Sequence, residues 1–218
     1  MSLPEIYQQF INEIKLTTPL EYLAVVSGIA SVWFSSKVNI LVYPVGLIST
    51  TIYIYLSIKG SLLGGAAVNL YYTLMSIYGW MLWVKKDIQQ HHIVVITHST
   101  NKEWLRQGLF FALCYAVIFT ALIYLKQNFT PGAIPWADGF ASATAFTGMW
   151  LMAKKKVESW YWWIVTNIAS IPLYFVKHYV FTSVYYFILL IFAFWGLAEW
   201  KKKAHRKNIQ PVYNSGAD

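Results

Sequence analysis

Long apolar runs separated by short polar or basic segments are the main pattern of this chain. Each run approaches the ~20 residues that an α-helix needs to cross the hydrocarbon core of a bilayer. Residues 3–16 alternate apolar and polar groups at helical spacing but are too few and too polar to span, so they predict a surface helix. Seven spanning helices are predicted after it, at about residues 19–35, 38–58, 62–84, 104–125, 134–153, 157–177 and 180–200.

The composition agrees with an all-α integral membrane protein. Of the 218 residues, 57% are hydrophobic and only 12% are charged, whereas about a quarter of a soluble domain is charged. The net charge of +8 comes from basic clusters beside the apolar runs, so it indicates anchoring to the lipid bilayer, and no nucleic-acid partner is expected. Cys114 is the sole cysteine, which excludes an internal disulfide and a structural cysteine-based metal site.

Lysine and arginine are distributed unequally between the two predicted sides of the membrane. Four of these 17 residues fall on the side of the amino terminus, and thirteen fall on the other side. Because cytoplasmic loops carry the excess of positive charge, the sequence predicts an amino terminus outside and a carboxy terminus in the cytoplasm.

An internal repeat relates the early and late parts of the chain. The pattern Gly-x-x-x-Trp-x-Lys-Lys occurs at Gly79–Lys86 and at Gly196–Lys203, and each copy begins 46 residues after a tryptophan. Between these anchors, a four-residue shift overlays residues 39–53 on residues 160–174. The sequence therefore predicts two related three-helix units with one helix between them.

This repeat predicts a 3+1+3 arrangement. Three helices reverse the direction of the chain across a membrane, so the intervening helix restores the first orientation and makes the repeats parallel. Transporters built in this way place their substrate site near the interface between the repeats. The predicted organisation is a surface helix (1–18), repeat 1 (19–86), a loop with the linker helix (87–133), repeat 2 (134–203) and a tail (204–218).

One face of the sixth predicted span carries rings and hydrogen-bonding groups. At about 100° per residue, its members fall within an arc of roughly 80°. Facing lipid, an Asn167 amide would be unpaired at a cost of a few kcal/mol, so the face is predicted to turn inward. Its candidate binding residues are Trp160, Trp163, Asn167 and Tyr174. Two interpretations of Trp160 stay open, a wall of the site or a member of an aromatic belt beside Lys154–Lys156.

The third predicted span offers a second candidate face. Asn69, Tyr72 and Ser76 share one side of this helix with Trp83. They are candidates for the sugar-binding side of a cavity, and hydrogen bonding between membrane helices is the alternative. The second span has a similar face with Asn39, Ser49 and Tyr53, for which gating or packing is favoured over substrate contact.

Several short motifs in order along residues 19–203 resemble the PnuC family of bacterial vitamin transporters. They are Ser31-Val-Trp33, Tyr43-Pro44-Val-Gly46, Met75-Ser-Ile-Tyr78-Gly79-Trp80 and Trp160-x-x-Trp163-x-x-x-Asn167. The resemblance implies a multi-pass protein of the bacterial inner membrane that shares the 3+1+3 fold of SWEET sugar transporters. It also implies that nicotinamide riboside is the cargo, that Trp160, Trp163 and Asn167 bind it, and that phosphorylation in the cytoplasm traps it.

The chemistry of this cargo matches the candidate residues. An indole face attracts a cationic aromatic ring, which favours Trp163, and Asn167 has a donor and an acceptor for a carboxamide or for sugar hydroxyls. Stacking accepts many flat rings, so thiamine, riboflavin and a nucleoside such as a deoxynucleoside remain alternative cargoes. Assembly into a homo-oligomer is left open.

Energy coupling is not predicted. Asp138 and Glu199 lie toward the ends of their spans, where pairing at the interface is favoured, and no acid lies in mid-membrane to carry a coupling ion. No Gly-x-x-x-x-Gly-Lys phosphate loop is present either. Facilitated diffusion is therefore expected, with no cofactor.

Other classes of protein fit less well. A retinal photoreceptor needs a lysine midway along the last span, and residues 180–200 contain none. No nucleophile, base and oxyanion set indicates an enzyme. The loop that holds His91, His92 and His98 lacks the ligand geometry that a metal site needs, so no metal is expected, and its role stays open.

Overall fold

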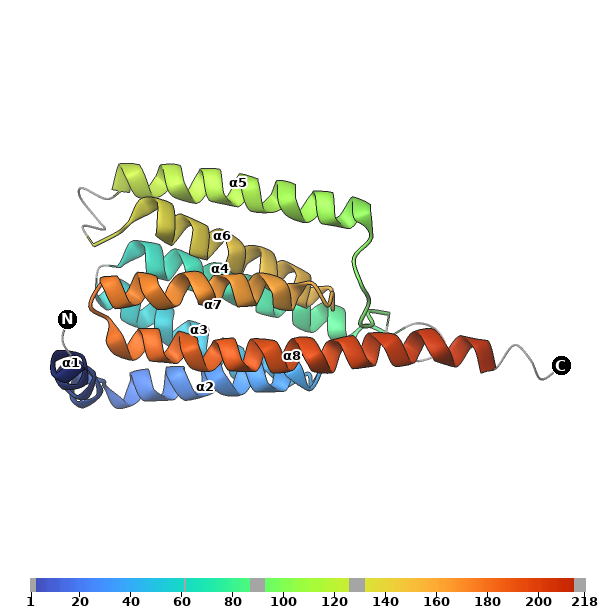
Figure 1. Cartoon of the computed structure of the whole chain (residues 1–218), viewed down its shortest axis with the longest axis horizontal. Helices are drawn as coiled ribbons and strands as arrows, with labels where there is room; N and C mark the ends of the chain where they lie inside the picture. Colours follow the sequence, from blue (N-terminus) through green and yellow to red (C-terminus); the bar gives the residue numbers. More distant parts are fainter. Residues whose placement is uncertain (1–2, 61, 87–92, 126–131, 214–218) are drawn as a thin grey trace.

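The computed structural model describes residues 3–60, 62–86, 93–125 and 132–213. Figure 1 shows the long helices side by side, with the short first helix seen end-on across one end. An isolated bridge joins Thr97 to Lys156. Within the described ranges the helices are α1 (Leu3–Leu16), α2 (Pro19–Ser36), α3 (Val42–Lys59), α4 (Leu63–Val84), α5 (Asn101–Leu125), α6 (Pro135–Ala153), α7 (Ser159–Val176) and α8 (Val180–Tyr213).

A helix occurs at every position predicted from the apolar pattern, and the surface helix over 3–16 is confirmed as α1. The second span was predicted to begin at 38, but α3 begins at Val42 because Val38 takes a positive φ of 62° and ends the preceding turn. The last span was predicted to end near 200, but α8 continues to Tyr213 and projects beyond the other helices (Figure 1). Its extension begins with three lysines and an alanine, Lys201–Ala204, which favour the helix.

Local signals set the starts of two helices. At α2, Thr18 accepts a hydrogen bond from the Glu21 backbone N–H at 3.3 Å, and the Glu21 carboxylate accepts one from the Thr18 N–H at 2.9 Å. Thr100 and Glu103 repeat this reciprocal pair before α5. Each reciprocal pair is a capping box, which gives partners to backbone N–H groups that the first helical turn leaves unpaired.

Within the described ranges, the three helices α2–α4 come before α5 and the three helices α6–α8 come after it. We call α2–α4 the first half and α6–α8 the second half. Within each half, consecutive helices pack against each other, and the halves meet where α2 contacts α8 and α4 contacts α6. The linker helix α5 packs against α6, on the outer side of the second half (Figure 1).

The two halves follow each other at a constant offset. The starts of α7 and α8 come 117 residues after the starts of α3 and α4, because Ser159 follows Val42 and Val180 follows Leu63 by that number. Lys155, with a positive φ of 52°, likewise follows Val38 by 117 residues.

The four-residue shift proposed for the middle of the repeat is therefore wrong. It paired Asn39 with Trp160, whereas the constant offset pairs Tyr43 with Trp160. The left-handed turn before each helix sets the register. The shift had matched Ser49 with Ser170 and Tyr53 with Tyr174, and at the offset of 117 residues these pairs are not at equivalent positions.

Equivalent residues of the halves face each other at their interface. Ser35 and Met152 are equivalent at this offset, and the Ser35 hydroxyl lies 3.0 Å from the Met152 sulfur. Trp83 and Trp200 are also equivalent, and their ring centroids are 6.2 Å apart. The two halves thus use the same positions to pack against one another.

Apolar side chains cover much of the outer surface. On α5, Leu105, Leu109, Leu113 and Val117 recur every four residues and are each 60% or more exposed. By length and mean hydropathy, Asn101–Leu125 (2.3) and Val180–Arg206 (2.0) are each apolar enough to cross a membrane. An apolar face of this extent is typical of contact with lipid.

The two repeat glycines make room for large rings. A methyl group added at Gly79 would overlap the Tyr43 ring, and one added at Gly196 would overlap the Trp160 ring. Both rings are almost fully buried. These glycines therefore permit close packing between helices of the same half.

We expect Gly79→Ala and Gly196→Ala each to destabilise the protein by about 1–3 kcal/mol, because the added methyl group forces a buried ring to move. Gly108→Ala is the matched control, since nothing lies within 4 Å of the position of its added methyl group. Thermal unfolding in detergent measures the effect. Equal unfolding midpoints for all three variants would contradict this packing.

Candidate functional site

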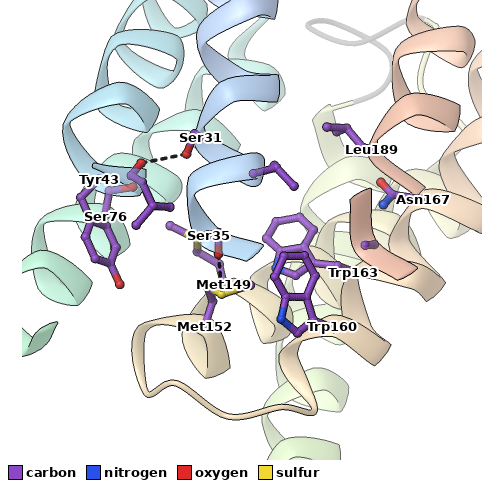
Figure 2. A pocket seen from close by; sticks show the side chains of 13 residues that line it. Ser31, Ser35, Tyr43, Ser76, Met149, Met152, Trp160, Trp163, Asn167 and Leu189 are labelled. Atoms are coloured by element: carbon purple, nitrogen blue, oxygen red, sulfur yellow. Dashed lines mark hydrogen bonds between the residues drawn. The ribbon is translucent and has the colours of Figure 1, made fainter. Parts of the chain in front are cut away.

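A cavity of about 100 Å³ lies between the two halves. This volume is enough for several water molecules at roughly 10–15 Å³ each. Figure 2 shows its walls, with side chains from α2, α3, α4, α6, α7 and α8 converging on one space. The lining residues are Ser31, Val32, Ser35, Val42, Tyr43, Ser76, Met149, Met152, Trp160, Trp163, Asn167, Leu189 and Ala193.

The predicted polar face of α7 turns inward, which the burial of its residues confirms. Trp160 is 1% exposed and Asn167 is 2% exposed. Trp160, Trp163 and Asn167 follow one another at i, i+3 and i+7, so a single helix face brings all three to the cavity. From the third predicted span, Ser76 reaches the same cavity.

Other candidate residues lie outside the lining. The Tyr72 ring packs on Trp163, with 6.2 Å between ring centroids, and so contacts the site indirectly. The Tyr174 ring stacks on Tyr186 at 5.2 Å. Asn69 donates from Nδ2 to the Gly65 carbonyl of its own helix at 2.9 Å.

The face of the second predicted span serves packing, as favoured from the sequence. Ser49 is buried and donates to the Ala24 carbonyl of α2 at 2.8 Å. Asn39 accepts from the Leu41 backbone N–H at 2.9 Å, in the turn before α3. Neither side chain lines the cavity.

The aromatic-belt interpretation of Trp160 is wrong. A belt residue lies at the surface of the protein, at the level of the lipid headgroups. Trp160 is instead packed inside the bundle, where its ring meets the Trp200 ring edge-on at 5.7 Å. The lysines that suggested a belt, Lys154–Lys156, lie in the turn between α6 and α7, before the helix that carries Trp160.

Three buried polar atoms have no hydrogen-bond partner among the described residues, and all three belong to residues of the cavity wall. They are Asn167 Oδ1, Trp160 Nε1 and the Tyr43 hydroxyl. An unpaired buried polar group costs about 1–3 kcal/mol, so such groups are rare in native proteins. In Figure 2 Tyr43 lies on the opposite side of the view from Trp160, Trp163 and Asn167.

No lining residue in the described part of the chain carries a charge at neutral pH. Two of the three serines are already engaged, because Ser31 donates to the Val42 carbonyl at 2.8 Å and Ser35 contacts Met152. The cavity therefore offers indole rings, thioethers and one amide with free acceptor capacity. Such a wall suits a flat, uncharged or cationic molecule and disfavours an anion.

The sequence argument missed the contributions of α2 and α6. Val32 and Ser35 on α2 and Met149 and Met152 on α6 are equivalent pairs, and all four line the cavity. Each pair lies three residues apart on one helix face, so the same face argument applied to these helices would have found them.

A polar network fixes the start of α7 outside the cavity. The buried Glu158 carboxylate accepts from the Ser99 backbone N–H at 2.9 Å and from the Ser99 hydroxyl at 2.7 Å, and it lies 3.0 Å from His98 Nδ1. Burial raises the pKa of Glu158, but the bonds from Ser99 and His98 outweigh it and hold that pKa below its usual value. His98 thus has a structural partner, while His91 and His92 lie outside the described residues.

The network continues to α5 and α7. Gln107 is fully buried in the apolar helix α5, donates to the Ser99 hydroxyl at 2.8 Å and accepts from Trp162 Nε1 at 3.1 Å. Trp162 is the neighbour of Trp163 in the sequence, and its ring packs toward α5. In the described ranges, no group of three or more His, Cys, Asp or Glu side chains is placed to hold a metal ion.

At the opposite end of the bundle, Asp138 pairs with Lys177. The Lys177 ammonium lies 2.6 and 2.7 Å from the two carboxylate oxygens, and Asp138 also accepts from the Ile134 backbone N–H at 2.6 Å. The predicted pairing of Asp138 near a span end is confirmed. The pair joins the start of α6 to the end of α7. Each charge is opposite in sign to the nearby end of its helix dipole and is stabilised by it.

Comparison with known proteins assigns the family. A family model described as nicotinamide mononucleotide transporter matches residues 18–202. The chain belongs to this family. A solved structure described as the vitamin B3 transporter PnuC has the same fold, with a TM-score of 0.69 and 25% identity, covering 92% of this chain and 88% of that one.

Curated relatives carry different cargoes. The riboflavin/roseoflavin transporter RibM of Streptomyces davaonensis is 22% identical over 186 residues, 85% of each chain. The nicotinamide riboside transporter PnuC of Escherichia coli is 21% identical, covering 88% of this chain and 89% of its own. PnuC of Neisseria mucosa is 29% identical over 162 residues, covering 72% of this chain and 60% of its own. These relatives are named as transporters, of riboflavin and roseoflavin in one case and of nicotinamide riboside in the other two.

We expect Glu158→Gln to lower the stability of the protein at neutral pH, because an amide cannot replace the charge-assisted bonds from Ser99 and His98. A carboxyl whose pKa is lowered by folding stabilises the protein above its unfolded pKa of about 4.3, and this stabilisation is lost as the pH falls through the lower folded pKa. The difference in unfolding midpoint between wild type and variant should therefore be largest near pH 7 and shrink toward pH 3. A difference that stays constant with pH would contradict this role for the carboxylate.

Proposed function

We propose that this protein carries nicotinamide riboside across the bacterial inner membrane by facilitated diffusion. The observation that carries the proposal is the convergence of Trp160, Trp163 and the unpaired Asn167 oxygen on a cavity without charged residues. Each part of the cargo has a counterpart there. The cationic pyridinium ring suits the Trp163 face, and the carboxamide N–H₂ suits Asn167 Oδ1.

The wall of the cavity favours the riboside over the phosphorylated mononucleotide. A phosphate carries at least one negative charge, and its desolvation needs cations or several N–H donors. The described lining has no lysine or arginine. The same wall accepts an uncharged flat ring, and the likeness to RibM makes riboflavin the second candidate cargo.

The proposed architecture is the SWEET-like 3+1+3 arrangement, with parallel repeats over 19–86 and 134–203. The constant offset of 117 residues and the contact between equivalent residues support it. So does the place of α5, which lies outside both halves and joins them. We propose that the amino terminus lies outside and that the carboxy tail, 204–218, lies in the cytoplasm, because thirteen of the 17 lysine and arginine residues are predicted on that side.

Passive transport is part of the proposal. Asp138 is held by Lys177 at one end of the bundle, so it is poorly placed to carry a coupling ion through the membrane. Net uptake then depends on consumption of the cargo in the cytoplasm, for which phosphorylation is the proposed reaction.

We expect Trp163→Leu and Asn167→Leu each to weaken nicotinamide riboside binding while the protein stays folded. Loss of the stacked ring should raise Kd about five- to thirtyfold, from roughly 1–2 kcal/mol of cation–π attraction. Titration of purified protein against nicotinamide riboside, the mononucleotide, riboflavin and thiamine measures both affinity and choice of cargo.

Two variants are matched controls for this titration. Trp162→Leu removes an indole that faces α5, and Asn69→Leu removes an amide that bonds its own helix. Both should leave Kd unchanged. Tighter binding of riboflavin than of nicotinamide riboside would select the second cargo, and equal Kd values for the site and control variants would place the binding site elsewhere.

In liposomes that contain only this protein, labelled nicotinamide riboside should reach equal free concentrations on both sides at zero membrane potential. The potential must be clamped because it acts on the cationic cargo with about 2.3 kcal/mol per 100 mV. Imposed proton or sodium gradients should leave the end point unchanged. Accumulation of unmodified cargo above the external concentration, driven by such a gradient, would refute passive transport.

A further inference from the structure

Two buried tryptophans make hydrogen bonds from one half of the bundle to the other. Trp83 on α4 donates from Nε1 to the Ala153 carbonyl at the end of α6, at 3.1 Å. Trp200 on α8 donates from Nε1 to the Ser35 carbonyl near the end of α2, at 3.0 Å. Each half therefore supplies one indole donor and receives the donor of the other half at the last turn of its first helix.

These tryptophans belong to a continuous layer of four rings. The Tyr43 ring meets Trp83 edge-on at 5.1 Å, Trp83 lies 6.2 Å from Trp200, and Trp200 lies 5.7 Å from Trp160. All four side chains are 3% exposed or less. Tyr43 and Trp160 line the cavity, whereas Trp83 and Trp200 pack behind them, so the layer closes the cavity on one side.

The closed side is the end of the bundle with the basic clusters. Trp83 is followed within three residues by two lysines and Trp200 by three, and the turn after α6 holds a third cluster, Lys154–Lys156. The Lys155 ammonium lies 4.4 Å from the centre of the Trp83 ring, so this turn also holds the ring in place. By the proposed topology this end faces the cytoplasm.

The repeated sequence motif explains how the layer is built. In each half, the glycine of Gly-x-x-x-Trp leaves space for the ring from the preceding helix, Tyr43 at Gly79 and Trp160 at Gly196. The tryptophan follows one helical turn later and so lies on the same face, directed at the other half. The motif thus specifies both the ring layer and its hydrogen bonds.

We propose that Trp83 and Trp200 form a reciprocal latch, the gate that closes the cavity on the lysine-rich side and opens when cargo is released there. This proposal rests on the proposed transport function. Both hydrogen bonds cross between the halves, so separation of the halves at this end breaks them together.

The chemistry of the layer permits such opening. The acceptor carbonyls belong to last helical turns, which water can hydrate once the indoles withdraw. Trp160 Nε1 and the Tyr43 hydroxyl have no partner in the described closed arrangement, and water would satisfy them in the open one. Opening therefore costs less free energy than it would if every polar group of the closed layer were already paired.

The test measures access to the cavity. In a Cys114→Ser background, Ala193→Cys places one thiol in the cavity wall. Its reaction rate with a membrane-impermeant maleimide, added to either side of proteoliposomes, reports opening. Trp83→Phe and Trp200→Phe keep a ring but remove the N–H donor, and each should raise the rate from the lysine-rich side about fivefold, as expected for loss of one hydrogen bond.

Trp136→Phe is the control, because this tryptophan is 65% exposed at the start of α6. It should leave the rate unchanged, and the variant with both latch substitutions should react faster than either single variant. Unchanged rates in the two latch variants, or equal increases from both sides, would overturn the latch. Because labelling needs no cargo, a wrong choice of cargo would leave these results intact and would appear only in the transport assay.

A second experiment does not depend on the stability of the phenylalanine variants. Ser35→Cys with Met152→Cys joins the halves beside the latch, where the two native side chains already touch. Oxidation of this pair should stop transport, and a reductant should restore it. If fully cross-linked protein transports as fast as the protein treated with reductant, this end does not need to open, and the proposal is overturned.

Discussion

Every polar group inside an apolar bundle must find a partner, and this constraint shapes the whole protein. Several buried hydroxyls meet it by bonding backbone carbonyls of their own helix, as Ser27 does with Leu23 and Thr147 with Ala143. Such groups can be buried anywhere without specifying a site. The unpaired groups are gathered instead at the cavity and at the ring layer beside it. A molecule or a water film in this region therefore replaces bonds that the protein does not make itself.

The two halves are alike where they close the cavity and unlike where they line its middle. Tyr43 and Trp160 are at equivalent positions, and each ring packs against an equivalent glycine, Gly79 or Gly196. At the same offset, however, Trp163 corresponds to Gly46, and Asn167 corresponds to Thr50, whose hydroxyl accepts from Thr73 within its own half. A methyl group added at Gly46 would meet the Ser31 hydroxyl at 2.8 Å. The second half thus supplies the two indoles and the amide of the cavity wall, and the first half supplies serine, valine and tyrosine side chains.

The sequence predicts the helices and part of the site, for identifiable reasons. Apolar runs locate the helices, and the periodicity of α7 brings Asn167 and Trp163 to the cavity. Asn69 shows the same polar signal, but its amide bonds its own helix, which periodicity cannot reveal. Tyr43 was not singled out as a site residue because its position depends on a glycine on another helix. Gln107 could have been found, since a lone amide in an apolar run needs a buried partner.

The network at Gln107 also determines which parts of the protein move together. The amide joins α5 to Trp162, the segment before α5 is bonded to the turn before α7, and α5 packs along α6. The linker helix is therefore fastened to the second half. If the halves rock, α5 moves together with α6–α8. A fluorescent or spin label on the outer face of α5 would then report the movement of the second half, although α5 lines no part of the cavity.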